Sequence, residues 1–306
     1  MGLDYLALFE KTSRVWHSPV SVLSLCFLAI GRIAPIVGLS PFFGARILPN
    51  PVKLVLAISL MIVLLPKLIL TISTPPTFDI TLFFLMIKEI FLGYIFGFFL
   101  GLPFLIVSTS GLFIDHQRGA ASLMTNDPTI QNQTSPVGTL YNLILISTFW
   151  AMNGPFYVLD TLYLSYDLIP PGTWINPIFL AEHSAVHERL INALYIFTAL
   201  SLQLAMPAFL AILMTDTFLG IINRLAPNVQ ITFLGMGLKS WFALMIVCLG
   251  LIPFVSQLEK EIKIWLIQFQ ELVYECRYPE GEKEAPSLPE LGASAKEFRA
   301  KPILSG

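Results

Sequence analysis

The chain has 306 residues, of which 55% are hydrophobic and only 12% are charged, and its formal net charge is -2. Soluble domains carry about 25% charged residues, so this composition excludes an ordinary soluble protein. The nearly balanced charge, without a basic patch, gives no indication of nucleic-acid binding. The composition therefore predicts an integral membrane protein.

Six long apolar segments predict an all-α protein that passes through a membrane several times. Each approaches the roughly 20 residues that span a bilayer as a helix, and a helix satisfies its backbone amides within the segment. Pro- and Gly-rich stretches separate the early segments, and Pro103 and Pro207 predict kinks within the third and fifth. The segments run at approximately 20–40, 53–72, 80–107, 139–164, 190–214 and 235–257.

The C-terminal part of the chain predicts two further regions after a membrane domain at residues 1–258. Residues 259–278 have apolar side chains at the 3–4 spacing of one helix face, so they predict an amphipathic helix. Such a helix lies on the membrane surface or packs against a partner. Residues 279–306 are polar and Pro-rich, which predicts a disordered tail.

Three charged residues lie inside the predicted membrane helices: Arg32, Lys88 and Glu89. A charge at a helix centre costs about 2.5–3.5 kcal/mol on insertion scales, so each needs a partner. Lys88 and Glu89 are adjacent and point in different directions, which predicts that they do not pair with each other. Their partners are expected from another helix or another chain. For Lys88, an ammonium that reaches the membrane interface is an equal alternative.

Gly93, Gly97 and Gly101 form two overlapping GxxxG steps on one face of the third predicted helix. Small residues at this spacing allow two helix backbones to approach closely in a membrane. The pattern predicts a packed helix pair, and it leaves open whether the second helix belongs to the same chain.

Asp216, Gly220 and Arg224 recur every four residues and share a helix face, before Pro227 ends that helix. A face of charges and a glycine at a helix end predicts a contact with another helix or subunit. The alternative is an interfacial loop whose charges reach the membrane surface.

The sequence has few features of an enzyme. His183 and His187 are four residues apart, but HExxH order and a third ligand are missing, so we expect a polar loop and no metal site. No nucleophile motif or phosphate-binding glycine loop is present, and no cofactor is expected. A small-solute transporter or channel that works alone is the main alternative, with Glu89 as its single clear acid inside a helix.

Several strings resemble the FliR/SctT family, the inner-membrane export-gate components of flagellar and virulence type III secretion. The resemblance covers roughly residues 20–255 and includes Arg32 with LSPFFGARILPNPVK, KEIFLGYIFGFFLG, DHQRGAASLMTNDP and LGIINRLAPNVQITFLGMGLK. Within the last string, Asn223, Arg224 and Pro227 belong to its most specific part. Lys88 stands where the family usually has Arg, and Pro155 stands where flagellar members often have His. The chain is thus most similar to the virulence branch.

This resemblance implies a hetero-oligomer with R- and S-type export apparatus membrane proteins, in which the chain is one structural subunit of an entry portal for unfolded secreted proteins. It further implies contacts with an autocleaving switch protein, the major export-gate protein, and needle or inner-rod subunits. The implied location is the bacterial inner membrane, with the assembly raised toward the periplasm.

The resemblance also implies that the connection between the third and fourth long segments closes the pore at rest. We expect Leu123 and Met124 to point into the conduit, because a flexible apolar Met can seal against varied chains. Asp127 and Pro128 would fix a turn, since Pro disfavours helix in the residue before it. The complete set of predicted gate residues is Gln117, Arg118, Ser122, Leu123, Met124, Thr125, Asn126, Asp127 and Pro128.

Overall fold

The structure is a computed structural model that describes residues 19–44, 48–71, 79–119, 135–174, 185–225 and 231–276. Every regular element in these ranges is helical, as predicted. The elements are α2 (Pro19–Leu39), the short 3-10 helix η1 (Pro41–Phe43), α3 (Asn50–Thr71), α4 (Ile80–Gln117), α6 (Pro136–Ala151), α7 (Gly154–Leu168), α8 (Ala185–Leu225), α9 (Ile231–Leu249) and α10 (Leu251–Glu275).

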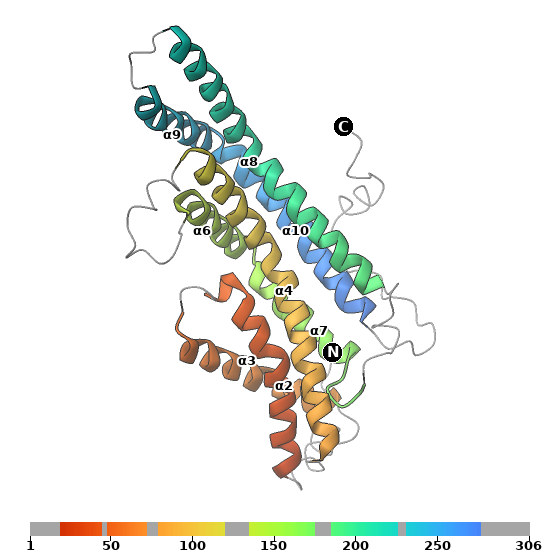
Figure 1. Ribbon diagram of the computed structural model, residues 1–306. Helices are drawn as coiled ribbons and strands as arrows, with labels where there is room; N and C mark the ends of the chain where they lie inside the picture. Colours follow the sequence, from red (N-terminus) through yellow and green to blue (C-terminus); the bar gives the residue numbers. More distant parts are fainter. Residues whose placement is uncertain are drawn as a thin grey trace.

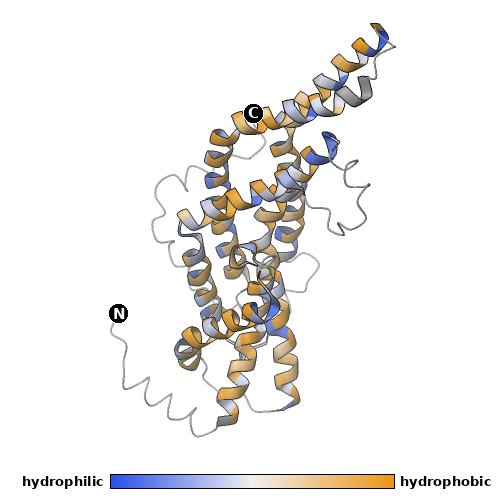
Figure 2. Cartoon of the chain, turned by 90° about the vertical axis from the view of Figure 1, so that its left-hand side faces the viewer, coloured by the Kyte–Doolittle hydropathy of each residue, from blue (hydrophilic) through white to orange (hydrophobic). Residues whose placement is uncertain are grey.

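The helices form an elongated bundle around α4 (Figure 1). Helix α4 contacts α2, α6, α8 and α10, and α8 pairs with α9. One continuous hydrophobic core runs through the bundle and contains buried side chains from each of these helices. Helix α9 contributes Ala243 and Val247. Hydrophobic residues predominate along the helices (Figure 2). Many of the large apolar side chains are exposed, as expected for a protein whose surface meets lipid or other subunits.

The number of membrane-length helices differs from the six predicted. The described residues contain four helices long and apolar enough to cross a membrane, or five if the bent pair α9 and α10 forms one span. The predicted segment 139–164 is two helices, because Asn153 adopts a left-handed backbone (φ 58°) that no helix can continue through. With 16 and 15 residues, α6 and α7 are each shorter than the roughly 20 residues of a span.

The sixth predicted segment also ends earlier than expected. Helix α9 stops at Leu249, and α10 leaves at 58° to it. Gly250 lies at the junction, and Pro253 has no N–H to bond the carbonyl four residues before it. Together these two residues explain the bend.

Helix α10 packs against its own chain. Its buried face contains Ile262, Trp265, Phe269, Leu272 and Val273, and it contacts α4, α6 and α7. The predicted apolar face is thus confirmed. The two predicted placements, on the membrane surface or on a partner, are wrong, because this face is already covered by the core of the same protein.

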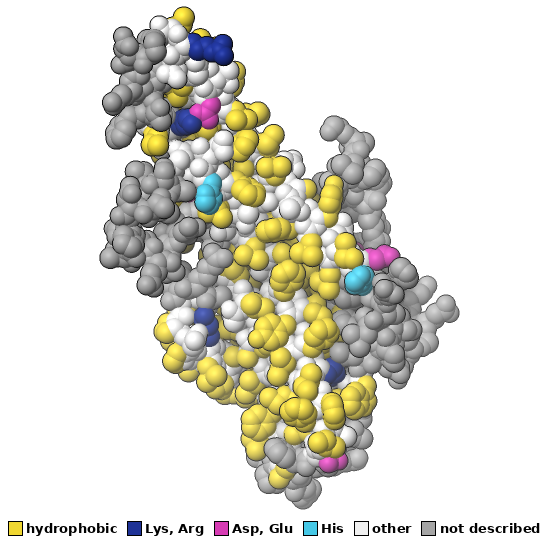
Figure 3. All heavy atoms as spheres, in the orientation of Figure 1, with side chains coloured by type: hydrophobic (Ala, Val, Ile, Leu, Met, Phe, Trp, Pro, Cys, Tyr) yellow, Lys and Arg dark blue, Asp and Glu magenta, His cyan; other side chains and the backbone are white. Residues whose placement is uncertain are grey.

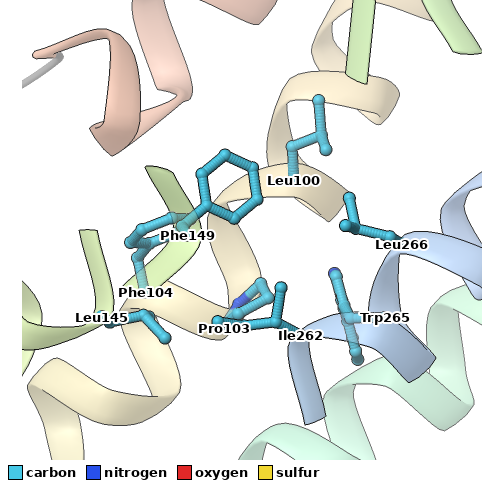
Figure 4. Close-up of a pocket in the computed structure, with 8 residues that line it drawn as sticks. All are labelled: Leu100, Pro103, Phe104, Leu145, Phe149, Ile262, Trp265 and Leu266. Carbon is cyan, nitrogen blue, oxygen red and sulfur yellow. The ribbon is translucent and has the colours of Figure 1, made fainter. Parts of the chain in front are cut away.

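Trp265 compensates for a proline in α4. Pro103 lacks an N–H, so the carbonyl of Phe99, four residues earlier, has no helical donor. The indole Nε1 of Trp265 donates to that carbonyl at 2.8 Å, and its ring stacks on Phe99 at 4.6 Å between centroids. Trp265 and Pro103 lie beside a small cavity lined entirely by apolar residues (Figure 4). Pro103 is therefore a docking point for α10, and the kink expected there remains a prediction.

Replacing Trp265 with Phe should destabilise the chain by about 1–3 kcal/mol, because the ring stack survives while a buried carbonyl loses its donor. Replacing Pro103 with Ala restores the backbone N–H and should reduce that cost. We expect the double variant to lose less stability than the sum of the losses of the two single variants. The measurement is thermal unfolding of the purified protein in detergent. Strict additivity would contradict the role assigned to the indole N–H.

Candidate functional site

Arg32 on α2 lies at the centre of a buried ionic cluster, and its side chain is fully excluded from solvent. Its guanidinium binds Glu89 on α4 through two bonds, from Nε at 2.6 Å and from Nη2 at 3.0 Å. Nη1 donates to the backbone carbonyl and hydroxyl of Ser165, and Nη2 donates to the carbonyl of Ile169. The ring of Tyr166 stacks on the guanidinium at 4.3 Å. All of the donor capacity of Arg32 is therefore used within this chain.

Lys88 completes this cluster, which we call the Arg32 cluster (Arg32, Lys88, Glu89, Ser165 and Tyr166). Its ammonium lies 2.6 Å from Glu89 Oε1. It also donates to the carbonyls of residues 170, 171 and 173, with the shortest bond, 2.9 Å, to residue 173. The prediction that these adjacent residues do not pair is wrong, because the flexible Lys88 side chain reaches both Glu89 and a third element, while Glu89 binds Arg32. The alternative of Lys88 reaching the interface is also wrong, since only 6% of the residue is exposed.

The third element is the C-terminal end of α7. Pro170 and Pro171 end this helix and leave its last carbonyls without helical donors. The C-terminus of a helix carries partial negative charge, so it favours nearby cations. Arg32 and Lys88 supply two, and the carboxylate of Glu89 binds both of them. The cluster fastens α2, α4 and α7 to one another.

The glycine face of α4 packs on α2 of the same chain. A Cβ atom added to Gly93 would lie 2.4 Å from the carbonyl oxygen of Arg32, and one added to Gly97 would lie 2.9 Å from that of Pro35. At Gly101 the nearest atom, the Leu39 carbonyl oxygen, would be 3.5 Å away. The two backbones thus touch most closely beside the Arg32 cluster. Any contact of these residues with a second subunit remains a prediction.

The face predicted on α8 is largely open. Asp216 forms an ion pair with Lys239 of α9. An added Cβ at Gly220 would meet no atom within 4 Å. Pro227 lies outside the described residues, and the proposed contact with another subunit remains a prediction. Three members of the set are exposed: Gly220, Asn223 and Arg224.

A second buried carboxylate, which sequence reasoning missed, lies at the other end of α4. Asp115 is 3% exposed. Its Oδ1 accepts a hydrogen bond from Arg118 Nε at 2.7 Å, and its Oδ2 accepts from the Ser135 hydroxyl and, at 3.0 Å, from the backbone N–H of Val137. Arg118 Nη1 also donates to the hydroxyl of Ser240 on α9 at 3.1 Å. We call these five residues the Asp115 cluster.

The Asp115 cluster borders the predicted gate. Gln117 is the last residue of α4, and Arg118 follows it as the C-terminal cap. The other predicted gate residues, Ser122 to Pro128, lie outside the described residues. Their position in a conduit therefore remains a prediction, whereas Arg118 is held by Asp115 and Ser240.

Comparison with known proteins supplies the family. Residues 23–264 match the model of the family described as bacterial export proteins, family 1. The chain belongs to this family. The resemblance stated from the sequence is confirmed, and the match covers both the Arg32 cluster and the Asp115 cluster.

Members of both branches of this export protein family are similar to the chain. The "Surface presentation of antigens protein SpaR" of Shigella flexneri is 33% identical over 54% of this chain and 61% of its own length, which is less than two thirds of that protein. The "Secretion system apparatus protein SsaT" of Salmonella typhimurium is 27% identical over 75% of this chain and 85% of its own. The "Flagellar biosynthetic protein FliR" of Escherichia coli is 26% identical over 83% and 95%.

Signals for the missed residues were present in the sequence. Asp115 lies in the last turn of a largely apolar helix and has an opposite charge three residues later, which is the spacing of a helical ion pair. Pro103 leaves an unpaired carbonyl that requires a donor, and Trp265 is the residue of the amphipathic face that has an N–H to offer. Nothing in the sequence indicates that Ser165 and Tyr166 join Arg32, because that contact depends on the tertiary fold.

Proposed function

We propose that the chain is a structural and gating subunit of a type III protein secretion export apparatus of the virulence branch. With R- and S-type subunits it would form the entry portal for unfolded proteins across the bacterial inner membrane. The observation that carries this proposal is the family match over residues 23–264. The virulence branch rests on the sequence resemblance and on the 33% identity with SpaR over 54% of the chain, because SsaT at 27% and the flagellar FliR at 26% do not separate the two branches.

The helix lengths support a subunit of a larger assembly. Helices α4 and α8 have 38 and 41 residues. At 1.5 Å per residue they are about 57 and about 61 Å long, roughly twice the hydrocarbon thickness of a bilayer. Exposed apolar side chains on α8 continue from Ile191 to Leu225. One bilayer cannot cover this length unless the helix is strongly tilted, so we propose that other subunits cover the remainder and that the assembly extends toward the periplasm.

The surface distribution is consistent with such partners. Of the most apolar stretch of α8, 22% is buried, compared with 61% for α4. Hydrophobic side chains dominate the face shown in Figure 3. The proposed neighbours are the R- and S-type proteins, while the switch protein, the major export-gate protein and needle or rod subunits contact the assembly elsewhere.

The Arg32 cluster argues against the alternative of a transporter that works alone. Such a protein needs an acid that can meet its solute or proton inside the membrane. Glu89 is fully buried, and both of its oxygens bind cations of the same chain. We infer that Glu89 holds helices together and that transport depends on a conduit formed between subunits.

We further propose that residues 120–134 close this conduit at rest, through Leu123 and Met124. Deleting residues 120–132 should raise ion leakage across the inner membrane several-fold in cells that produce the assembled complex. Arg118 and Ser135 both contact Asp115, so the shortened chain can rejoin without separating α4 from α6.

The control is a chain truncated after Cys276, which also loses a polar segment and should not leak. Co-purification of the R- and S-type subunits must show that both variants assemble. An assembled complex that lacks residues 120–132 and remains as tight as the unaltered one would refute the gating role.

A further inference from the structure

We propose that Asp115 is a positioning residue that holds the two ends of the 120–134 connection together and links them to the α8–α9 hairpin. The inference rests on the proposed gating function of that connection and adds how its base is held. It concerns only the described residues on either side of the connection.

Both ends of the connection meet at one carboxylate. One oxygen of Asp115 binds Arg118, which follows α4, and the other binds Ser135 and Val137, which begin α6. Asp115 thus binds a residue that lies 20 positions further along the chain. Each of its oxygens is occupied, and the group is almost completely buried. A buried carboxylate that is satisfied in this way fixes the geometry of its partners, because moving either one leaves a polar group unpaired.

The helix ends favour this arrangement electrostatically. Arg118 caps the C-terminus of α4, where positive charge is stabilising, and the carboxylate of Asp115 lies at the N-terminus of α6, where negative charge is stabilising. The Ser135 hydroxyl also caps α6 by accepting the N–H of Gly138 at 2.9 Å. The ion pair between Arg118 and Asp115 therefore stabilises both the C-terminus of α4 and the N-terminus of α6.

The helices also touch directly beside the cluster. A Cβ atom added to Gly111 would lie 2.3 Å from the backbone nitrogen of Gly138, and one added to Gly138 would lie 2.7 Å from the Ser108 carbonyl oxygen. Backbone contact this close leaves no room for α4 and α6 to slide. The base of the connection is consequently rigid in the state that the structure shows.

A second set of contacts joins this base to α8. Arg118 donates to Ser240 on α9, and the neighbouring residue of α9, Lys239, pairs with Asp216 on α8. Polar contacts thus follow one another from α8 through α9 to α4 and α6, across helices that are otherwise packed by apolar side chains. Because α8 has the large exposed apolar face, movement of a subunit bound there would be transmitted to Arg118.

The test measures the separation of the two ends and the leakage in parallel. Spin labels are placed at the exposed positions His116→Cys and Leu140→Cys in the full-length chain within its assembled complex, with Cys26, Cys248 and Cys276 replaced by Ala. We expect one narrow distance distribution. Asp115→Asn should broaden it, because the amide has a single acceptor oxygen and can serve either Arg118 or the Ser135 and Val137 donors but not both. It should also raise ion leakage several-fold.

Two further variants make the test specific. Asp160→Asn applies the same chemical change to an exposed carboxylate of α7 and should leave both readouts unchanged. Ser240→Ala breaks only the hydrogen bond between Arg118 and α9. We therefore expect its ion leakage to differ from that of the unaltered complex, while its spin-label distance distribution stays narrow. If Asp115→Asn prevents assembly, Ser135→Ala removes one of the three hydrogen bonds to Asp115, together with the cap on the Gly138 N–H, and should give the same effects in weaker form.

The outcomes separate this inference from the gating proposal. An unchanged distance distribution in Asp115→Asn would overturn the inference. A broadened distribution without leakage, while deletion of residues 120–132 does leak, would overturn the positioning role and leave the gate intact. A broadened distribution with no leakage in either variant would support the link at Asp115 and refute the gate.

Discussion

Glu89→Gln should be among the most damaging single substitutions in this protein. The change leaves Arg32 and Lys88 buried without a counter-ion, and breaking a buried ion pair by removing one partner costs about 3–5 kcal/mol. Arg32 is fully buried and Lys88 is 6% exposed, so water cannot compensate for the loss. We expect a large drop in the amount of folded chain in membranes and a lower thermal unfolding midpoint in detergent.

The matched control is Glu259→Gln, the same change at an exposed position of α10, where we expect little effect. A second control is the double variant Arg32→Gln with Glu89→Gln. It removes one charge of each sign, and two amides can hydrogen-bond to each other, so it should be more stable than the sum of the single variants. Similar losses at Glu89 and Glu259 would show that the Arg32 cluster does not hold the helices together.

The pairing of charges within the Arg32 cluster is compatible with a location inside the membrane. An ionic group this completely paired has little need of water, so it can lie at membrane depth without the full cost of an isolated charge. Pairing is thus the physical reason that the apolar helices α2 and α4 can contain three ionisable residues, Arg32, Lys88 and Glu89. A sequence search for proton-carrying acids therefore selects Glu89, although its carboxylate is paired with Arg32 and Lys88.

The sequence was sufficient for features that depend on local pattern. Four of the six long apolar segments are single long helices in the structure, as length and composition predicted. The amphipathic face of α10 and the glycine face of α4 follow from a period along one helix, and both are present. Helix breaks were harder to predict. Asn153 interrupts an apolar run through a backbone conformation that hydropathy does not register.

The partners of the buried charges could not be predicted, because they depend on which helices meet. Sequence spacing gave Lys88 and Glu89 different directions, yet Lys88 reaches both Glu89 and the carbonyls that follow α7, while Glu89 binds Arg32. Asp115 joins residues on each side of a long connection, and Arg118 reaches a serine of α9; no local pattern contains that information. Tertiary contacts of this kind decide the candidate site, so the site was less predictable than the fold.

The glycines of α4 give a graded prediction of how closely two helices must approach. Gly93→Ala would place a methyl carbon 2.4 Å from the carbonyl oxygen of Arg32, so α2 and α4 must separate by about 1 Å to restore the usual C···O contact of 3.3–3.6 Å. Overpacking of this kind costs about 1–3 kcal/mol. The separation would also displace Arg32 from Glu89, so we expect the loss to approach the upper end of that range.

Alanine substitution of the other two glycines of this face should cost less stability where the added methyl group has more space. Gly97→Ala, with a contact of 2.9 Å, should cost less than Gly93→Ala, and Gly101→Ala, at 3.5 Å, should be tolerated. Gly38→Ala on α2 meets no atom within 4 Å and is the control, which can gain up to about 1 kcal/mol from the better helix propensity of Ala. Thermal unfolding midpoints should follow this order. If Gly93→Ala proves as stable as Gly101→Ala, the close packing of α2 on α4 is not what stabilises the pair, and the Arg32 cluster alone must hold them.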